Sequence, residues 1–567
     1  MGHEQESTIS KGFKLGIKFF KEEKKFFAIS GLITLIGFEL FHVYLLVRFN
    51  QWYSTFYNTL QNLDKSGFKK QLLVFAVLAL IYVANALIKI TIRLWYSLEW
   101  RNWMTNHYLN KWTKNNTYYT SKIFDQEVDN PDQRISQDIK EFSDFTIDLF
   151  LGFLTAVTTL VSFVVILWGV SGVFKINIFQ YHFNIHGYFV WIALIYALLG
   201  TYFTHKIGRP LSDLLFKQEK KEADFRYQLV RLRENAESTA MYNAIDFEKD
   251  GMLEKFKKIL SNTKHIIFRQ MKITTFVSFY EQIAIILPIL VASPKYFLKQ
   301  ITLGGLMQIS NAFGEVKTAL SWLITSYTTI ANLRAVIERL DGFDKSLALS
   351  YELAKKTELR FLNDKNNILI KDLEVSLPSN ELLFNCKNLT LDKSSYLIMG
   401  KSGVGKSSLF KTLRGLWPFT EGEVYFPQNA KVMFVPQKIY MPLGELKKAI
   451  AYPKIKDICN DTIIELLKKF DLKHLIEKLS TVDEWSRVLS SGEQQKLAIL
   501  RCILNKPDIV FLDEATSALD VINEKIVYET LKENLKGLTI ISIAHKDTLK
   551  RFHESILVLQ DGKLKYI

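Results

Sequence analysis

Cysteine is scarce in this chain of 567 residues, and long polar tracts are missing. The only three cysteines, Cys386, Cys459 and Cys502, lie in the C-terminal half and match no metal-binding spacing. Their scarcity excludes a disulfide scaffold and suits a reducing cytosol. Aromatic residues make up 13% of the chain, so a mainly disordered protein is excluded as well.

Long apolar runs are present instead, and all of them lie before about residue 330. A bilayer span requires about 20 mostly apolar residues. The first three runs are clear, whereas the fourth is short and the last two are interrupted by charge. A buried core helix could mimic one such run, but not six in series. The six predicted spans are roughly 26–49, 72–92, 149–170, 187–204, 274–292 and 303–330.

The net charge of +15 also favours a membrane over a nucleic acid, because the lysines crowd beside the apolar runs. Residues 1–25 carry six lysines and residues 205–270 carry fourteen Lys plus Arg, whereas residues 171–186 carry one lysine. The positive-inside rule therefore places both termini and the long charged segments in the cytoplasm. The N-terminus does not resemble a signal peptide, since the apolar run after it is too long.

After about residue 341, short apolar strands alternate with amphipathic helices, which is typical of an α/β domain with a largely parallel sheet. The predicted strands include 395–399, 431–435, 509–512 and 538–543. The predicted organisation is a basic cytoplasmic tail (1–25), a six-helix transmembrane domain with long cytoplasmic helical extensions (26–340), a linker (341–367) and the α/β domain (368–567).

Residues 400–407 fit the pattern G-x-x-x-x-G-K-[ST] between a strand and a helix, which is the context that this phosphate-binding loop requires. Its backbone N–H groups and the helix N-terminus would face phosphate oxygens. We expect Lys406 to reach the β- and γ-phosphates of ATP and Ser407 to ligate Mg²⁺. The plain alternative is a glycine-rich turn with a chance lysine. The other expected phosphate-binding residues are Gly400, Ser402, Gly403, Val404, Gly405 and Ser408.

The predicted strand 509–512 ends in two acids, Asp513 and Glu514. Carboxylates at the carboxyl end of a strand lie where ligands bind in open α/β sheets. We expect Asp513 to hold Mg²⁺ through water and Glu514 to act as the general base that polarises the attacking water. Many strands end in acids, so this pair supports a nucleotide site only in combination with the motifs around it.

The run Leu489-Ser490-Ser491-Gly492-Glu493 is close to the L-S-G-G-Q signature of ATP-binding cassette (ABC) proteins. The C-terminal domain resembles that family throughout. The resemblance implies that Gln437 is the Q-loop residue, which contacts Mg²⁺ and the catalytic water, and that His545 is the switch histidine. It also implies that Asp520 belongs to the D-loop and that Ser490, Ser491, Gly492 and Glu493 help to bind nucleotide. A lone P-loop kinase or GTPase has no use for the signature or the D-loop.

In the ABC family each ATP lies between the P-loop of one domain and the signature of a second. The signature here precedes a helix whose N-terminal amides, with Ser490, can bind a γ-phosphate. One nucleotide domain and six spans resemble a half-transporter with an exporter-type fold, so we expect a homodimer. The spans argue against a non-transport ABC ATPase. The intact Lys406, Asp513 and Glu514 argue against a degenerate ATP site.

Two positions depart from the family pattern. Ser491 replaces the second glycine of the signature, and we expect activity to survive unless that position requires a positive φ. Leu377, before Pro378, stands where an aromatic residue usually stacks on adenine. Tyr396 and Phe384 are near in sequence, but sequence alone places neither ring on the base.

Several stretches look like the subfamily D and SbmA/BacA-like branch of ABC transporters, within its members that carry a fused nucleotide domain. They are residues 130–135, 233–242, 416–418 and 489–495. An ordinary Asn-Pro turn and a solvated helix face are the plain alternatives for the first two. The wider branch carries acyl-CoAs, cobalamin and hydrophilic peptides.

This resemblance implies an ATP-driven transporter, and we expect import of hydrophilic solutes such as cobalamin or peptides. The alternative is an exporter or flippase of lipid or acyl-CoA-like amphiphiles, since the fold does not settle direction. The expected partners are a second copy of the chain, membrane lipid and the solute, with no nucleic acid. The expected location is a bacterial inner membrane, with several spans and a cytoplasmic nucleotide domain.

Ionisable residues within the predicted spans bear on the solute. Glu39 and His42 share one helical face, Glu281 lies in the fifth span, and Glu315 and Lys317 lie in the sixth. Charges in hydrocarbon are costly, so these side chains should face the bundle interior, water or each other. Interhelical pairing and a polar, net-acidic translocation cavity both remain open interpretations.

Overall fold

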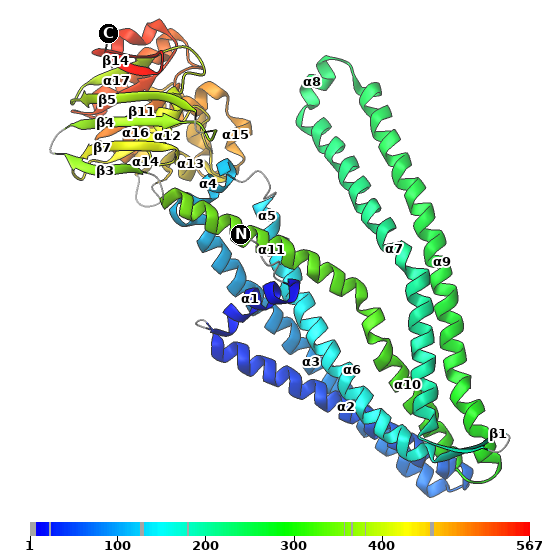
Figure 1. Ribbon diagram of the computed structural model, residues 1–567. Coiled ribbons are helices and arrows are strands. Elements are labelled where there is room, and N and C mark those ends of the chain that lie inside the picture. Colours follow the sequence, from blue (N-terminus) through cyan, green and yellow to red (C-terminus); the bar gives the residue numbers. More distant parts are fainter. Residues whose placement is uncertain are drawn as a thin grey trace. The chain divides into compact units, whose positions relative to one another are not determined.

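The structure is a computed structural model that describes residues 7–21, 24–124, 130–178, 181–355, 358–364, 367–379, 381–453 and 459–566. Its contacts divide the chain into two compact units. One unit combines Met1–Tyr108 with Asn130–Gly342, and the other combines Leu109–Asp129 with Phe343–Ile567. Figure 1 shows the helices and strands of both.

Long helices dominate the first unit. Helices α7 and α9 run side by side as a hairpin with α8 at its tip (Figure 1). Strands β1 (Val173–Ile178) and β2 (Tyr181–His186) pair antiparallel between α6 and α7. The helices up to residue 355 are α1 (Thr8–Lys21), α2 (Lys25–Gln61), α3 (Lys65–Thr113), α4 (Thr117–Phe124), α5 (Pro131–Gln133), α6 (Ile139–Ser171), α7 (Tyr188–Glu234), α8 (Ala236–Met241), α9 (Ile245–Phe297), α10 (Leu303–Thr325) and α11 (Tyr327–Lys355).

Five helices of the described residues are long and apolar enough to cross a membrane, and they contain the first five predicted spans. Helix α10, which contains most of the sixth predicted span, is not among them. It carries two charged residues, Glu315 and Lys317, in its middle. Six spans are therefore not confirmed. Helix α10 nevertheless packs against α2, α6, α7 and α9, with Ile309, Phe313 and Val316 buried.

Two of the intramembrane acids form ion pairs between helices. The carboxylate of Glu39 on α2 accepts hydrogen bonds from Lys89 of α3 (3.1 Å) and Thr155 of α6 (2.8 Å). Lys317 of α10 donates to Glu281 of α9 at 2.5 Å. These contacts favour interhelical pairing for both acids. Glu315 is half-buried and has no ionic partner among the described residues.

The second unit contains a ten-stranded sheet with the order β3-β7-β4-β5-β14-β13-β6-β12-β11-β8. Its strands are β3 (Glu358–Asp364), β4 (Ile368–Ser376), β5 (Leu382–Leu391), β6 (Ser395–Met399), β7 (Thr420–Pro427), β8 (Val432–Val435), β11 (Ile509–Asp513), β12 (Thr539–Ile543), β13 (Ser555–Gln560) and β14 (Lys563–Tyr566). The helices are α12 (Lys406–Leu413), α13 (Leu446–Ala451), α14 (Asn460–Lys469), α15 (Trp485–Val488), α16 (Ser491–Asn505) and α17 (Val521–Asn534). Two short strands, β9 (Gly444–Glu445) and β10 (Val482–Asp483), pair separately.

The sheet has a parallel part and an antiparallel part. Strands β13, β6, β12, β11 and β8 are parallel neighbours, whereas β4 pairs antiparallel with both β5 and β7. The expectation of an α/β fold is correct, but the sheet is more mixed than predicted. The reason is that only five residues separate β4 from β5, a connection too short to join parallel neighbours. The proposed linker 341–367 contains the end of α11 and strand β3.

Hydrophobic side chains form two clusters in the described part of this unit. One cluster packs α13, α14, α16 and α17 together, and the other packs α12 with β4, β5 and the interior of β6. Strand β12 is buried along its whole length, and β11 is buried until it reaches Asp513. Because β11 is buried up to its last residue, the carboxylate of Asp513 is placed at the end of the strand, at the edge of the sheet.

Candidate nucleotide-binding site

The P-loop connects β6 to α12, and its glycines are required by its backbone. Gly403 and Gly405 have φ of +85° and +99°, which L side chains rarely adopt. A Cβ at Gly405 would lie 2.6 Å from the side chain of Leu383, and one at Gly400 would lie 2.5 Å from the carbonyl oxygen of Leu559. A Cβ at Gly403 would meet nothing within 4 Å, so the loop leaves open space there for a phosphate.

Lys406 begins α12 and is 6% exposed. Its ammonium donates to the carbonyl oxygens of Gly400 (2.8 Å) and Lys401 (2.7 Å), so the lysine lies along its own loop. Burial lowers the pKa of Lys406, and the carboxylates of Glu514 and Asp513 oppose that shift. An ammonium held among carbonyls on the inner side of a glycine loop is placed to bind phosphate oxygens.

One carboxylate oxygen of Asp513, the last residue of β11, is free to bind a further ligand. That oxygen, Oδ1, is buried and has no hydrogen-bond partner among the described residues. Burial raises the pKa of Asp513, while a hydrogen bond from Ser407 lowers it. A buried carboxylate oxygen beside a serine hydroxyl is a ligand set that suits Mg²⁺. These two residues therefore fit the metal that accompanies ATP.

Glu514 is the point on which the other candidate catalytic residues converge. Gln437 donates from Nε2 to Oε2 of Glu514 at 2.9 Å, and Nε2 of His545 lies 3.4 Å from Oε1. The three residues follow β8, β11 and β12, which are adjacent parallel strands, so their carboxyl ends meet at one edge of the sheet. Glu514 has φ of +48°, an uncommon conformation for a non-glycine residue.

The signature forms the N-terminus of α16 through a capping box. The hydroxyl of Ser490 accepts from the N–H of Glu493 (3.3 Å), and the carboxylate of Glu493 accepts from the N–H of Ser490 (2.8 Å). His474 contacts the other oxygen of Glu493 at 2.7 Å. Burial would raise the pKa of Glu493, but these hydrogen bonds outweigh it and lower the pKa.

Ser491 is the first residue of α16 and has no positive φ, and Gly492 follows it inside the helix. The backbone at Ser491 therefore does not have the positive φ that would make a serine harmful at this position. Among the described residues, the signature makes no hydrogen bond with the P-loop of the same chain. The structure thus brings together the P-loop, Asp513, Glu514, Gln437 and His545, but leaves the signature out of that group.

Sequence reasoning missed two buried polar residues of α16. Gln495 donates to the hydroxyl of Ser517 (3.0 Å) and accepts from the N–H of Ala518 (2.9 Å), so it ties the signature helix to the D-loop. Asp520, at the end of that loop, caps α17 by accepting from the N–H of Asn523 at 2.7 Å.

Arg501 is the second missed residue, and it is 6% exposed. It donates to the carbonyl oxygens of Tyr440 (2.7 Å) and Ala449 (2.7 Å), which follow the Q-loop. Burial lowers the pKa of Arg501 to about 10. The signal in the sequence is a glutamine and an arginine on the otherwise apolar face of a helix.

Neither nearby aromatic ring is available to replace the expected adenine stack. Phe384 is fully buried in the core, and Tyr396 is 4% exposed with its hydroxyl accepting from the N–H of Asp392. Leu377 itself is half-buried at the turn between β4 and β5, where its N–H donates to Glu381.

Comparison with known families agrees with this geometry. Residues 386–517 match the family described as "ABC transporter", and residues 23–297 match "ABC transporter transmembrane region 2". A chloroplastic protein of Arabidopsis thaliana, "ABC transporter D family member 2", is 31% identical over 99% of this chain and 87% of its own length. The chain belongs to the ABC transporter family.

Two further relatives cover nearly the whole transporter. "Inner membrane ABC transporter ATP-binding protein YddA" of Escherichia coli is 31% identical over 91% of each chain. "Lysosomal cobalamin transporter ABCD4" of Homo sapiens is 27% identical over 94% of this chain and 91% of its own length. This transporter thus combines a region-2 membrane domain with an ABC ATPase domain, and subfamily D members are among its relatives.

Membership establishes several coarse properties. The protein is a multi-pass membrane protein, and its ATPase domain binds and hydrolyses ATP to drive transport. One membrane domain and one ATPase domain make a half-transporter, an architecture that implies dimerisation.

Proposed function

We propose that the protein works as a homodimer that uses ATP to import a hydrophilic solute, of the class of cobalamin or a peptide. The observation that carries the ATP-driven part is the convergence of Gln437 and His545 on Glu514. The solute class is supported by Glu315, which is half-buried in α10 without an ionic partner among the described residues and which a pathway selective for lipid would not need. A relative whose name includes cobalamin transport also supports it.

Glu514 is the general base in this proposal, because its carboxylate lies between a glutamine and a histidine at the edge of the sheet. Gln437 would orient the attacking water, and His545 would stabilise the γ-phosphate. Asp513, the hydroxyl of Ser407 and Gln437 would hold Mg²⁺, which would neutralise charge on the phosphates.

The phosphates of ATP lie in the loop from Gly400 to Ser408, with Lys406 between the β- and γ-phosphates. Ser490, Ser491, Gly492 and Glu493 of a second copy complete each site, and Asp520 lies beside the interface. Support comes from the capping box, which presents the first amides of α16 with a fixed orientation. Each homodimer then contains two equivalent sites.

The proposal includes six spans, with α10 as the sixth, and a nucleotide domain on the cytoplasmic side of a bacterial inner membrane. Helix α10 is amphipathic in a way that suits a helix enclosed by others: its buried face contacts four neighbouring helices. The fourteen Lys plus Arg of residues 205–270 support the cytoplasmic side for that segment.

Transport in proteoliposomes tests the proposal. In vesicles whose nucleotide domains face outward, external ATP should drive the solute out of the lumen. In vesicles whose nucleotide domains face inward, ATP loaded in the lumen should drive the solute into it. We expect ATP to move radiolabelled cobalamin or a basic peptide toward the nucleotide-domain side. ATP-dependent movement of a fluorescent lipid or an acyl-CoA away from that side, with neither hydrophilic solute moved, would instead establish an exporter or flippase.

A further inference from the structure

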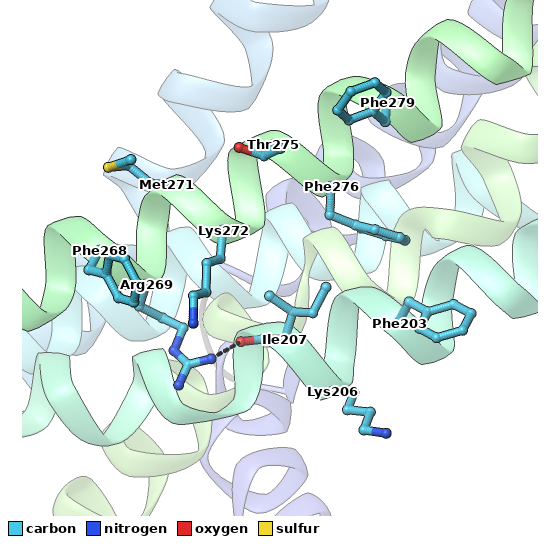
Figure 2. Close-up of a pocket in the computed structure, with 10 residues that line it drawn as sticks. All are labelled: Phe203, Lys206, Ile207, Phe268, Arg269, Met271, Lys272, Thr275, Phe276 and Phe279. Carbon is cyan, nitrogen blue, oxygen red and sulfur yellow. Dashed lines mark hydrogen bonds between the residues drawn. The ribbon is translucent and has the colours of Figure 1, made fainter.

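A pocket of about 800 Å³ lies between α7 and α9, and its lining includes three cations. Figure 2 shows that these cations do not converge, because Arg269 and Lys272 are directed toward α7 whereas Lys206 points away from both. Arg269 is also engaged within the hairpin, where it donates to the carbonyl oxygen of Ile207 at 3.4 Å. The pocket therefore concentrates no charge, and the stronger evidence for an unassigned role lies at the signature.

The fifth residue of the signature is a carboxylate, Glu493, where the family pattern L-S-G-G-Q has a neutral amide. One of its oxygens, Oε2, accepts from both the N–H and the hydroxyl of Ser490, each at 2.8 Å. The other oxygen, Oε1, lies 2.7 Å from Nε2 of His474, which belongs to the 3-10 helix η3 (Lys473–Lys478). Glu493 thus joins the serine that is expected to bind a γ-phosphate to an ionisable histidine.

The charge of Glu493 opposes the expected role of Ser490. In the proposed homodimer, Ser490 of one copy faces the γ-phosphate that the P-loop of the other copy binds. A carboxylate bonded to that serine would then approach a phosphate of the same sign, and like charges repel more strongly where water is excluded. A positive charge on the other carboxylate oxygen would offset this repulsion. An imidazolium in contact with Oε1 supplies that charge.

The surroundings of the pair favour His474 as the member whose charge changes. Burial opposes the ionisation of Glu493, but hydrogen bonds from Ser490 and His474 outweigh it and lower the pKa, so the carboxylate is charged at neutral pH. Histidine is the side chain whose charge ordinarily changes between about pH 5 and 8. Helix α14 also packs against η3. Within the described residues, no hydrogen bond or ion pair joins His474 to the other charged residues of these elements, which are Asp461, Glu465, Lys468 and Lys469 of α14, Lys473, Glu477 and Lys478 of η3, and Lys496 of α16.

We propose that His474 is a positioning residue of the ATPase reaction, which as an imidazolium holds Glu493 and offsets its charge where the signature meets the ATP of the second copy. This role rests on the proposed sharing of ATP sites between two copies. The neutral imidazole can still donate to Glu493 but lacks the compensating charge. ATP therefore binds more weakly as the pH rises and His474 loses its proton. His474 acts through Glu493 and does not need to touch the nucleotide.

The test measures KM for ATP and kcat of the purified full-length protein at about pH 6 and about pH 8, on either side of the range in which imidazoles change charge. His474→Gln keeps a hydrogen-bond donor for Glu493 and removes the charge, whereas Glu493→Gln restores the neutral amide of the family pattern. Lys473→Gln is the matched control, because it removes a charge from the neighbouring exposed position of η3. The titration of ATP itself and of His545 is common to all variants and cancels in the comparison.

At about pH 6 we expect the KM of His474→Gln to be about threefold higher than that of the wild type, which is the scale of a partly exposed ion pair. At about pH 8 the two values should agree, because neither protein then carries the charge, and kcat should differ little at either pH. In Glu493→Gln the addition of His474→Gln should have no effect at either pH. Lys473→Gln should follow the wild type throughout.

A mixed dimer separates this inference from the proposal of shared sites. In a dimer of a Lys406→Ala chain with a Ser490→Arg chain, only the signature of the Lys406→Ala chain serves an intact P-loop. His474→Gln should therefore raise KM at about pH 6 when it is placed in that chain, and should have no effect in the Ser490→Arg chain. An inactive mixed dimer would count against the shared sites, and the comparison in the homodimer would still decide the role of His474.

Two results would overturn the role of His474. One is equal KM of the wild type and His474→Gln at both pH values, which in combination with an active mixed dimer leaves the shared sites intact. The other is a KM raised equally at both pH values, which would show a structural hydrogen bond without a contribution from charge.

Discussion

Arg339 of α11 donates two hydrogen bonds to Asp138, from Nε to Oδ2 at 2.9 Å and from Nη2 to Oδ1 at 2.6 Å. Asp138 is completely buried and also accepts from Arg134 at 2.6 Å, four residues earlier in a single π-helical turn. That turn, Arg134–Asp138, overlaps the end of the Asn130–Ile135 stretch, one of the stretches that resemble subfamily D. The stretch therefore has a structural purpose: it anchors the start of α6 to α11.

Arg339→Ala should lower the free energy of unfolding by about 2 kcal/mol, because it leaves a buried carboxylate with one of its two charged partners. Thermal unfolding of the purified protein in detergent measures this loss. Glu141→Ala is the matched control. Glu141 lies 3.8 Å from the same guanidinium but is partly exposed, so its loss should change stability by less than about 0.5 kcal/mol. Equal effects of both variants would contradict the anchoring role of Asp138.

His553 should make the ATPase domain less stable in mild acid. Burial lowers the pKa of its imidazole to about 4, and the ring lies between the carbonyl of Leu549 and the hydroxyl of Ser542. Between pH 6.5 and 4 the unfolded chain therefore binds a proton that the folded chain does not, so stability falls as the pH falls through this window.

From pH 6.5 to 5 the loss should be on the order of 2 kcal/mol. Hydrogen exchange of the amides in β12, corrected for intrinsic rates, reports it, and His553→Gln should flatten the dependence. An unchanged slope in that variant would assign the acid sensitivity to other groups.

The adenine pocket should discriminate weakly between purines, because Leu377 offers no π-face and the two nearby rings are buried elsewhere. Losing one stacking term costs about 1 kcal/mol, so GTP should support hydrolysis within roughly tenfold of ATP. Leu377→Tyr should lower the KM for ATP, while Leu382→Tyr, at an exposed position of the next strand, should not. Strong ATP preference in the wild type with no effect of the new tyrosine at 377 would contradict a vacant stacking position.

Glu514→Gln should bind ATP but hydrolyse it at least about 10²-fold more slowly, the usual loss when a general base is removed. The substituted amide keeps the size of the side chain and removes the charge that accepts a proton. Glu533→Gln, on the exposed face of α17, serves as a control and should hydrolyse ATP at the wild-type rate. Wild-type turnover by Glu514→Gln would move the base elsewhere, and His545 would be tested next.

The placement of the candidate nucleotide-site residues was predictable, because they belong to short contiguous motifs or directly follow buried strands. Gly400 to Ser407 form one loop, and Gln437, Glu514 and His545 each follow a strand that an apolar run identifies. The pairing of Glu39 with Lys89 was not predictable, since it depends on how α2 and α3 are rotated against each other. The antiparallel placement of β4 and β7 was missed for a similar reason, as pairing between distant strands leaves no local pattern.

The two-site homodimer is tested most directly by mixing two inactive chains. Lys406→Ala disables the P-loop, and Ser490→Arg disables the signature, so each parent homodimer lacks both working sites. A heterodimer purified with two different tags joins an intact P-loop from one chain to an intact signature from the other at one site. We predict that this heterodimer hydrolyses ATP clearly faster than either parent. Activity of the mixed pair no higher than that of the parents, together with hydrolysis by a verified monomer of the wild type, would contradict ATP sites shared between two copies.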